Sequence, residues 1–187
     1  GGIHKKYDVE PDMAMFGKAL GNGYAITAVI GRREIMSSAE VTFISSTFWT
    51  ERIGPSAALK TLEVMEREKS WEKITETGKS IRQGWQDLAD NYDLPIKHWG
   101  LPSLTGFTFE SSKALEYKSL ISQEMLTKGY LAANSVYVCT EHTKDIVEGY
   151  FDSLDSIFSS IRDCEDGRDV YDLLNGPVCH DGFARLN

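Results

Sequence analysis

Residues 11–24 read PDMAMFGKALGNGY and place Lys18 between a short apolar run and two closely spaced glycines. The run Met13–Phe16 predicts a brief strand, and Gly17 lets the chain turn at the end of that strand. The two glycines that follow allow positive φ angles and a close approach of another group to the backbone. This setting suits an amine that is held on a strand, aimed by a tight turn and left uncrowded, so that it can form a Schiff base with a flat cofactor. A surface lysine in a glycine turn is the alternative that these residues leave open.

The composition is that of an ordinary globular protein. The 187 residues are 41% hydrophobic and 26% charged, which is enough for one domain with a real core, or somewhat more. The formal net charge of -8 argues against a nucleic-acid partner, because phosphate contacts need a basic face. No apolar run approaches the roughly 20 residues of a membrane span. The 3 cysteines are widely spaced, which argues against a zinc site or a disulfide framework and favours a cytoplasmic protein.

The first part of the chain predicts short strands and turns followed by two long helices. A β-branched run at 25–30, closed by a glycine, predicts a second strand, while residues 32–38 predict a short helix and residues 41–45 a third strand. Gly54-Pro55 opens a long amphipathic helix. Ser70 is the predicted N-cap of a second helix that ends near residue 91.

The second part predicts a small sheet with helices packed on it. Strands are expected at 96–99 and 104–109, and shorter ones at 130–131 and 136–138. Helical spacing of apolar residues predicts helices over 112–128, 143–161 and, more briefly, 170–174. The fold class is therefore mixed α/β, with one part at 1–92 and the other at 93–187.

At three places the sequence resembles the class III aminotransferases, which depend on pyridoxal phosphate, and in particular members similar to glutamate-1-semialdehyde aminomutase. The first is the lysine segment from Pro11 to Tyr24, the second is Gly31 to Met36, and the third is Ser45 to Phe48 before an Ala- and Leu-rich helix. The resemblance extends to about Ile161. It implies fold type I of the pyridoxal-phosphate-dependent transferases. Residues 1–92 would be the C-terminal part of the large cofactor-binding domain and residues 93–187 the small C-terminal α+β domain.

The resemblance also implies roles for three residues. Lys18 would form the Schiff base with pyridoxal 5'-phosphate and, once displaced by an incoming amino group, would move a proton between the substrate and the cofactor. Thr47 would donate its hydroxyl to the cofactor phosphate of the other subunit, with Ser46 as a weaker companion. The implied protein is a homodimer that acts on small amino and keto compounds, as an aminotransferase or a 2,1-aminomutase.

Two features of the chain qualify these expectations. Family members are about twice as long, so the alternative is a non-catalytic C-terminal segment that needs its missing N-terminal half to bind the cofactor. Many members also carry an arginine on the strand that opens the small domain, whereas this chain reads Lys97-His98-Trp99-Gly100-Leu101. That departure leans toward the aminomutase branch and leaves the substrate open. A phosphate- or nucleotide-binding module is the third class considered, and it fits poorly because Lys18 precedes the glycine pair.

Overall fold

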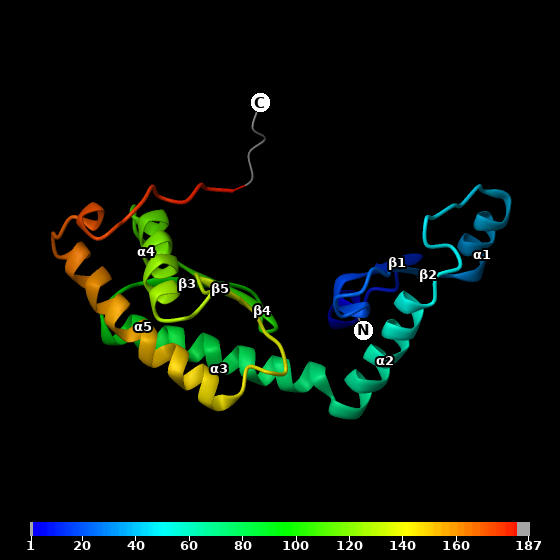
Figure 1. Ribbon diagram of the computed structural model, residues 1–187, viewed down its shortest axis with the longest axis horizontal. Coiled ribbons are helices and arrows are strands. Elements are labelled where there is room, and N and C mark those ends of the chain that lie inside the picture. Colours follow the sequence, from blue (N-terminus) through cyan, green and yellow to red (C-terminus); the bar gives the residue numbers. More distant parts are fainter. Residues whose placement is uncertain (1, 183–187) are drawn as a thin grey trace. The chain divides into compact units, whose positions relative to one another are not determined.

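The computed structural model describes residues 2–182, and its contacts divide the chain into two units (Figure 1). The first unit is Gly1–Ser70 and the second is Trp71–Asn187. No helix in the described part is both long and apolar enough to cross a membrane. The last five residues of the predicted second part, 183–187, lie outside the described residues, as does Gly1.

The first unit is built from a two-stranded ribbon, several short helices and one long helix. The strands β1 (Met13–Phe16) and β2 (Ala28–Gly31) are antiparallel, and Met15 lies opposite Val29. The long helix is α2 (Ile53–Glu68), and the shorter elements are η1 (Ile3–Tyr7), η2 (Lys18–Leu20), α1 (Arg33–Met36) and η3 (Ser37–Val41), where η marks a 3-10 helix.

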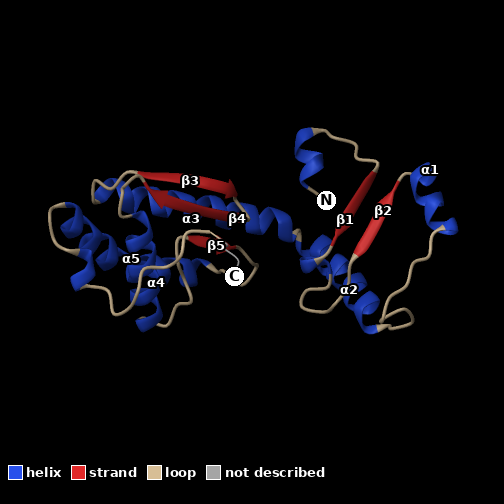
Figure 2. Ribbon diagram, turned by 90° about the horizontal axis from the view of Figure 1, so that it is seen from above, coloured by secondary structure: helices blue, strands red, loops and turns tan. Residues whose placement is uncertain are grey.

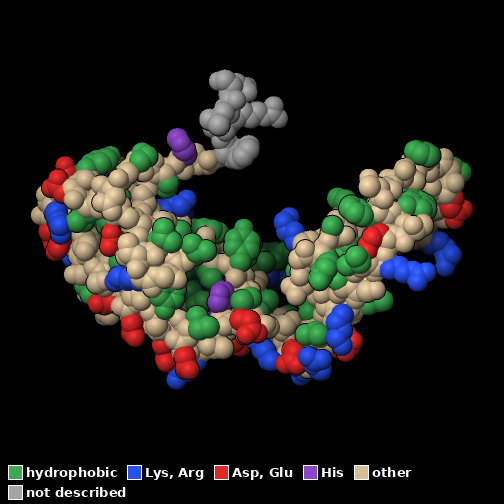
Figure 3. Space-filling view, in the orientation of Figure 1, with side chains coloured by type: hydrophobic (Ala, Val, Ile, Leu, Met, Phe, Trp, Pro, Cys, Tyr) green, Lys and Arg blue, Asp and Glu red, His purple; other side chains and the backbone are tan. Residues whose placement is uncertain are grey.

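Most apolar side chains of the first unit are exposed in the chain by itself. Met15 is 84% exposed and Phe43 is 92% exposed, and Figure 3 shows hydrophobic side chains open to solvent on this unit. Along β1 the burial alternates, with exposed methionines and half-buried Ala14 and Phe16. The ribbon therefore has an apolar face that nothing else in this unit covers.

The structure corrects two strand predictions in the first unit. Residues 41–45 form no strand, because Val41 ends η3 and the following backbone has no partner strand. Polar groups of this segment form local hydrogen bonds instead. The Thr42 hydroxyl, for example, donates to the Ser38 carbonyl at 2.8 Å. The strand predicted at 25–30 is confirmed in part, because only residues 28–31 pair with β1.

The second unit combines one antiparallel sheet with long helices (Figure 2). The strand order is β3-β4-β5, with β3 at Ile96–Leu101, β4 at Leu104–Phe109 and β5 at Ser135–Tyr137. The helices are α3 (Ser70–Asn91), α4 (Ala114–Thr127) and α5 (Lys144–Glu165), and a short 3-10 helix, η4 (Val170–Asp172), follows them.

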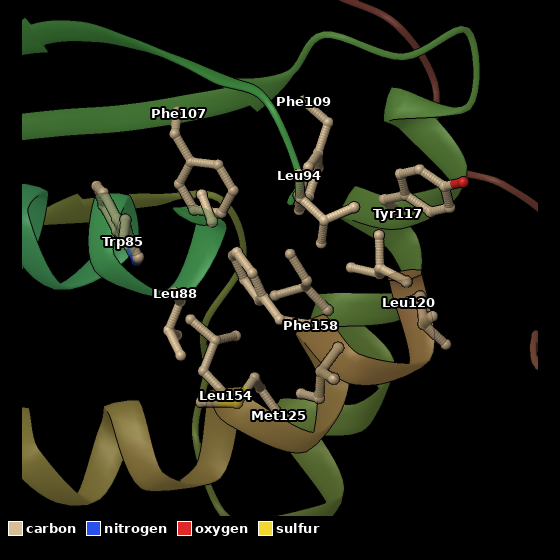
Figure 4. Packing of buried hydrophobic residues seen from close by; sticks show 14 of the residues in the cluster. Trp85, Leu88, Leu94, Phe107, Phe109, Tyr117, Leu120, Met125, Leu154 and Phe158 are labelled. Atoms are coloured by element: carbon tan, nitrogen blue, oxygen red, sulfur yellow. The ribbon is translucent and has the colours of Figure 1, made fainter. Parts of the chain in front are cut away.

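The core of the described chain lies in the second unit, where apolar side chains of α3, α4 and α5 meet one face of the sheet (Figure 4). Phe107, Tyr117 and Phe158 have no exposed surface, and Phe107 lies 4.9 Å from Trp85 between ring centroids. Burying a side chain of this size stabilises a fold by about 1.5–3 kcal/mol. Aromatic side chains and the aliphatic residues Leu120, Ile121 and Leu154 therefore hold this unit together.

Most elements predicted for the second unit are present. Both β3 and β4 are confirmed, and α5 continues four residues beyond its predicted end. Residues 130–131 form no strand: Gly129, with φ +87°, ends α4, and the Tyr130 N–H returns to the Met125 carbonyl at 2.9 Å. Contacts divide the chain after Ser70 and not after residue 92, because α3 packs into the core of the second unit.

Candidate functional site

Lys18 lies one residue beyond the end of β1 and adopts a left-handed backbone conformation. Its φ angle is 50°, whereas the preceding Gly17 is extended with φ −161°. The Gly21 N–H donates to the Lys18 carbonyl at 3.2 Å and closes the short helix η2. A non-glycine residue at positive φ is uncommon and costs on the order of 1 kcal/mol, so the turn holds the lysine at some energetic cost.

Gly21 is the glycine on which this turn depends. A Cβ atom at this position would lie 2.1 Å from the Tyr24 carbonyl oxygen and 2.8 Å from the Ile26 side chain. The same segment lies against the start of α2, since a Cβ atom on Gly54 would lie 2.9 Å from the Ala25 carbonyl oxygen. The lysine turn is thus packed on the first turn of α2.

Lys18 lines an open hollow of about 870 Å³ within the first unit, and its side chain is exposed there. Ser46 lines the same hollow, as do the aromatic residues Tyr24, Phe48 and Trp49. Thr47 does not line it, although both of its neighbours do. The structure therefore brings together two of the three residues that the sequence singled out, Lys18 and Ser46.

An acidic side chain, Glu51, also lines this hollow, and no motif in the sequence pointed to it. Its carboxylate accepts the Gly54 N–H at 2.9 Å and also the Ile53 N–H. Two N–H groups of the first turn of α2 are satisfied in this way. Glu51 consequently orders the start of α2 beneath the hollow.

The donor set around the hollow fits pyridoxal phosphate in part. It offers the Lys18 amine to a carbonyl carbon, the Ser46 hydroxyl to a phosphate, and aromatic side chains to a flat ring. The Ser46 hydroxyl already takes part in one hydrogen bond, because its oxygen accepts the Phe48 N–H at 3.3 Å. The acidic group at the hollow, Glu51, already accepts one backbone N–H of α2 on each of its carboxylate oxygens.

The strand β3 carries no arginine of its own and is contacted by one from a different element. Arg82 of α3 donates to the Trp99 carbonyl at 2.9 Å and to the Gly100 carbonyl and the Thr105 hydroxyl. Its guanidinium is therefore used to join α3 to the β3–β4 hairpin. Nothing in the sequence indicates that residues 82 and 99 are in contact, and only the folded structure shows it.

A protein-family model described as "Aminotransferase class-III" matches residues 3–143 of the chain. The chain is 32% identical over 154 residues to a 3-aminobutyryl-CoA aminotransferase of Cloacimonas acidaminovorans, covering 78% of this chain and 36% of that protein. It is 26% identical over 162 residues to a glutamate-1-semialdehyde 2,1-aminomutase of Methanosphaera stadtmanae, covering 78% of this chain and 38% of that protein.

Two solved structures have folds similar to that of this chain. The FumI protein of Sphingopyxis sp. MTA144, in its PLP internal aldimine form, matches with a TM-score of 0.78 and 22% identity over 91% of this chain and 42% of that one. A PLP-bound transaminase matches with a TM-score of 0.76 and 19% identity, over 89% and 42%. The chain spans about two fifths of the length of these proteins, and its fold is that of the corresponding part of type I transaminases. It belongs to the class III aminotransferase family.

Proposed function

We propose that the protein containing this chain transfers or shifts an amino group with pyridoxal 5'-phosphate, and that Lys18 is the residue to which the cofactor attaches. The observation that carries the proposal is the placement of Lys18. It has a left-handed φ of 50° directly after Gly17 and lines a hollow together with Ser46. Family membership and relatives named as aminotransferases and aminomutases support the same chemistry.

Each of the three residues has a defined task in this proposal. Bound pyridoxal phosphate supplies an electron sink for a carbanion. The neutral Lys18 Nζ acts as a nucleophile when the cofactor loads and, once released, takes up and returns a proton at the substrate carbon. The Ser46 and Thr47 hydroxyls donate hydrogen bonds to the phosphate, because a dianion held away from water needs several donors.

We further propose a homodimer in which Thr47 serves the site of the partner subunit. Support comes from the exposed apolar side chains of the first unit, including Met15, Phe43 and Trp49, which a partner would cover. Analytical ultracentrifugation of the chain tests this. A mass that stays at one chain across a wide concentration range would count against self-association.

The decisive experiment traps the cofactor on the lysine. Pyridoxal phosphate is added, the mixture is reduced with borohydride, and peptide mass spectrometry locates the added mass. Lys18→Ala is expected to abolish the labelled peptide. Lys69→Ala is the matched control, because Lys69 is an exposed lysine of the same unit with a similar φ of 47° and does not line the hollow. Label that persists in Lys18→Ala at another lysine would refute the assignment.

A non-catalytic segment is the second candidate, and one observation favours it. Among the described residues, Glu51 is the one acidic side chain that lines the hollow, and it is bound to backbone N–H groups of α2. The 187 residues alone would then bind pyridoxal phosphate weakly and turn over little or nothing. Tight binding by the isolated chain, measured by absorbance titration, would argue against this alternative.

Aminotransferase and 2,1-aminomutase are both open as the activity of the protein that contains this chain. The work of Lys18 Nζ is the same in both reactions, so the residues of this chain do not separate them. A purified full-length protein that isomerises one amino-aldehyde without a second carbonyl compound is an aminomutase. A protein that needs a separate amino donor and keto acceptor is an aminotransferase.

We also infer that the protein works in a reducing compartment, which points to the cytoplasm. The three cysteines, Cys139, Cys164 and Cys179, are free thiols in the structure. Unpaired thiols persist where glutathione and thioredoxin keep them reduced. Thiol titration of protein purified without reductant tests this, with three reactive groups expected after unfolding.

A further inference from the structure

A second, smaller pocket lies wholly within the second unit and shares no residue with the Lys18 hollow. It encloses about 130 Å³ between α3, α5, β5 and the loop before β5. A cavity of about this size holds one six-membered ring. Its apolar walls are formed by Ile81, Trp85, Ala132, Val136, Ile146 and Val147.

The pocket selects against charge. Among residues 2–182, no aspartate, glutamate, lysine or arginine lines it. A charged molecule would lose its hydration without gaining an ionic partner, at a cost of several kcal/mol. The walls therefore suit a neutral ligand whose body is apolar.

One buried hydroxyl in the pocket has an unused proton. The Trp85 Nε1–H donates to the Tyr150 oxygen at 2.8 Å, and an indole nitrogen can only donate. Tyr150 must therefore accept in this bond, and no acceptor for its own O–H is found among residues 2–182. Tyr150 is half-buried, and desolvation raises the pKa of its hydroxyl above its ordinary value, so the proton stays on the oxygen at neutral pH.

A second polar group at the pocket is also a donor. His142 Nδ1 accepts the Cys139 N–H at 3.2 Å. In a neutral imidazole the other nitrogen, Nε2, then carries the proton. Tyr130 and Ser135 also line the pocket, and their hydroxyls can donate or accept. A ligand oxygen that accepts hydrogen bonds would therefore find donors at Tyr150 and His142.

We propose that this pocket binds a small neutral molecule, about one ring in size, through apolar contact and an oxygen acceptor that receives the Tyr150 proton. This site stands on its own residues and does not depend on the proposed chemistry at Lys18.

Two nearly isosteric probes test the acceptor requirement on the unmodified 187-residue chain. Anisole carries an ether oxygen and ethylbenzene carries a methylene in its place. Binding is followed by the Trp85 indole N–H signal in ¹H–¹⁵N spectra. Anisole is expected to bind about 3- to 10-fold more tightly, which corresponds to one net hydrogen bond. Equal affinities, or no saturable binding of either probe because another segment or a second chain fills the pocket, would overturn the proposal.

Variants locate the binding. Tyr150→Phe is expected to lower the affinity for anisole to that for ethylbenzene, while ethylbenzene binds as before. Ala132→Leu fills the pocket and should abolish binding of both probes. Ala133→Leu is the matched control, because Ala133 is the next residue and does not line the pocket. Undiminished binding to Ala132→Leu would place the probes elsewhere and contradict the assignment.

Discussion

At the scale of single residues, backbone strain at the candidate site falls on two non-glycine residues, Lys18 and Asn22. The sequence suggested that glycines would take the positive φ angles, and Gly23 does so at 102°. Lys18 takes one as well, at 50°, although its Cβ makes this conformation unfavourable. The proposed attachment of the cofactor would require the Lys18 amine to be held in one direction, and a strained turn of this kind would serve that purpose at the expense of local stability.

Gly21→Ala tests whether this turn positions Lys18. The new methyl group would sit 2.1 Å from the Tyr24 carbonyl oxygen, so the backbone must move, at a cost of about 1–3 kcal/mol. We expect borohydride trapping of pyridoxal phosphate at Lys18 to fall at least several-fold. Gly176→Ala is the control, because a Cβ atom there meets nothing within 4 Å, and it should leave trapping unchanged. Full trapping in Gly21→Ala would show that the turn is not needed.

His98 predicts a pH dependence of stability in the second unit. Burial, with the Arg82 charge nearby, lowers the pKa of His98 below its ordinary value near 6.5. The unfolded chain then binds a proton first as the pH falls, so this group weakens the fold below about pH 6.5, and its contribution is complete above that value. We expect the urea midpoint to fall between about pH 7.5 and 5.5, before carboxylates titrate.

His98→Gln should remove most of that pH dependence while keeping a polar group near Gln86, which His98 contacts at 3.1 Å through Nε2. His180→Gln is the matched control, because His180 is exposed, and it should retain the dependence of the parent chain. An unchanged pH profile in His98→Gln would assign the effect to other groups.

At the scale of elements, local patterns were sufficient for the long helices and for one hairpin. Helices α2, α3 and α5 carry apolar residues at helical spacing over 16 or more residues, so the signal is strong. The strands β3 and β4 lie next to each other in the chain and need no distant partner. The β-branched run at 41–45 looks like a strand by composition, and only the tertiary structure shows that no neighbour pairs with it.

The candidate site was predictable to a similar degree. Lys18 and Ser46 were identified from motifs, and the structure places them at one hollow. Glu51 was missed because glutamate is not a favoured N-cap residue, and its bonds to Ile53 and Gly54 depend on the turn that precedes α2. Thr47 remains a prediction, since its role involves a second subunit.

Arg82 joins two elements, which predicts a measurable loss of stability when it is removed. Its bonds reach the Trp99 and Gly100 carbonyls and the hydroxyl of the fully buried Thr105. Arg82→Met leaves these groups with fewer partners and should cost about 1–3 kcal/mol in urea unfolding. Lys79→Met, on the exposed face of α3, is the control and should stay within about 0.5 kcal/mol of the parent. Equal midpoints for the two variants would show that the Arg82 bonds contribute nothing net.

At the scale of the whole molecule, the two units differ in how much apolar surface each buries. The second unit contains a cluster of fully buried side chains, among them Phe107, Ile121 and Leu154. Within residues 2–70, the first unit buries only the small residues Gly21, Gly54 and Ala58, while Met15 and Phe43 stay largely exposed. Since burial of apolar area supplies most of the folding free energy, the isolated chain should be unequally stable along its length.

Native-state hydrogen exchange tests this inequality directly. Amides of β4 and the buried turns of α5 should exchange only through opening of the whole second unit, and therefore slowest. Amides of β1 and β2 should exchange at least 100-fold faster, because a lone two-stranded ribbon is marginally stable. A rise in protein concentration that slows exchange in β1 and β2 alone would indicate that a second chain covers the exposed ribbon face. Equal protection of both units at low concentration would contradict the inequality, because it would mean that the first unit is stable without further cover.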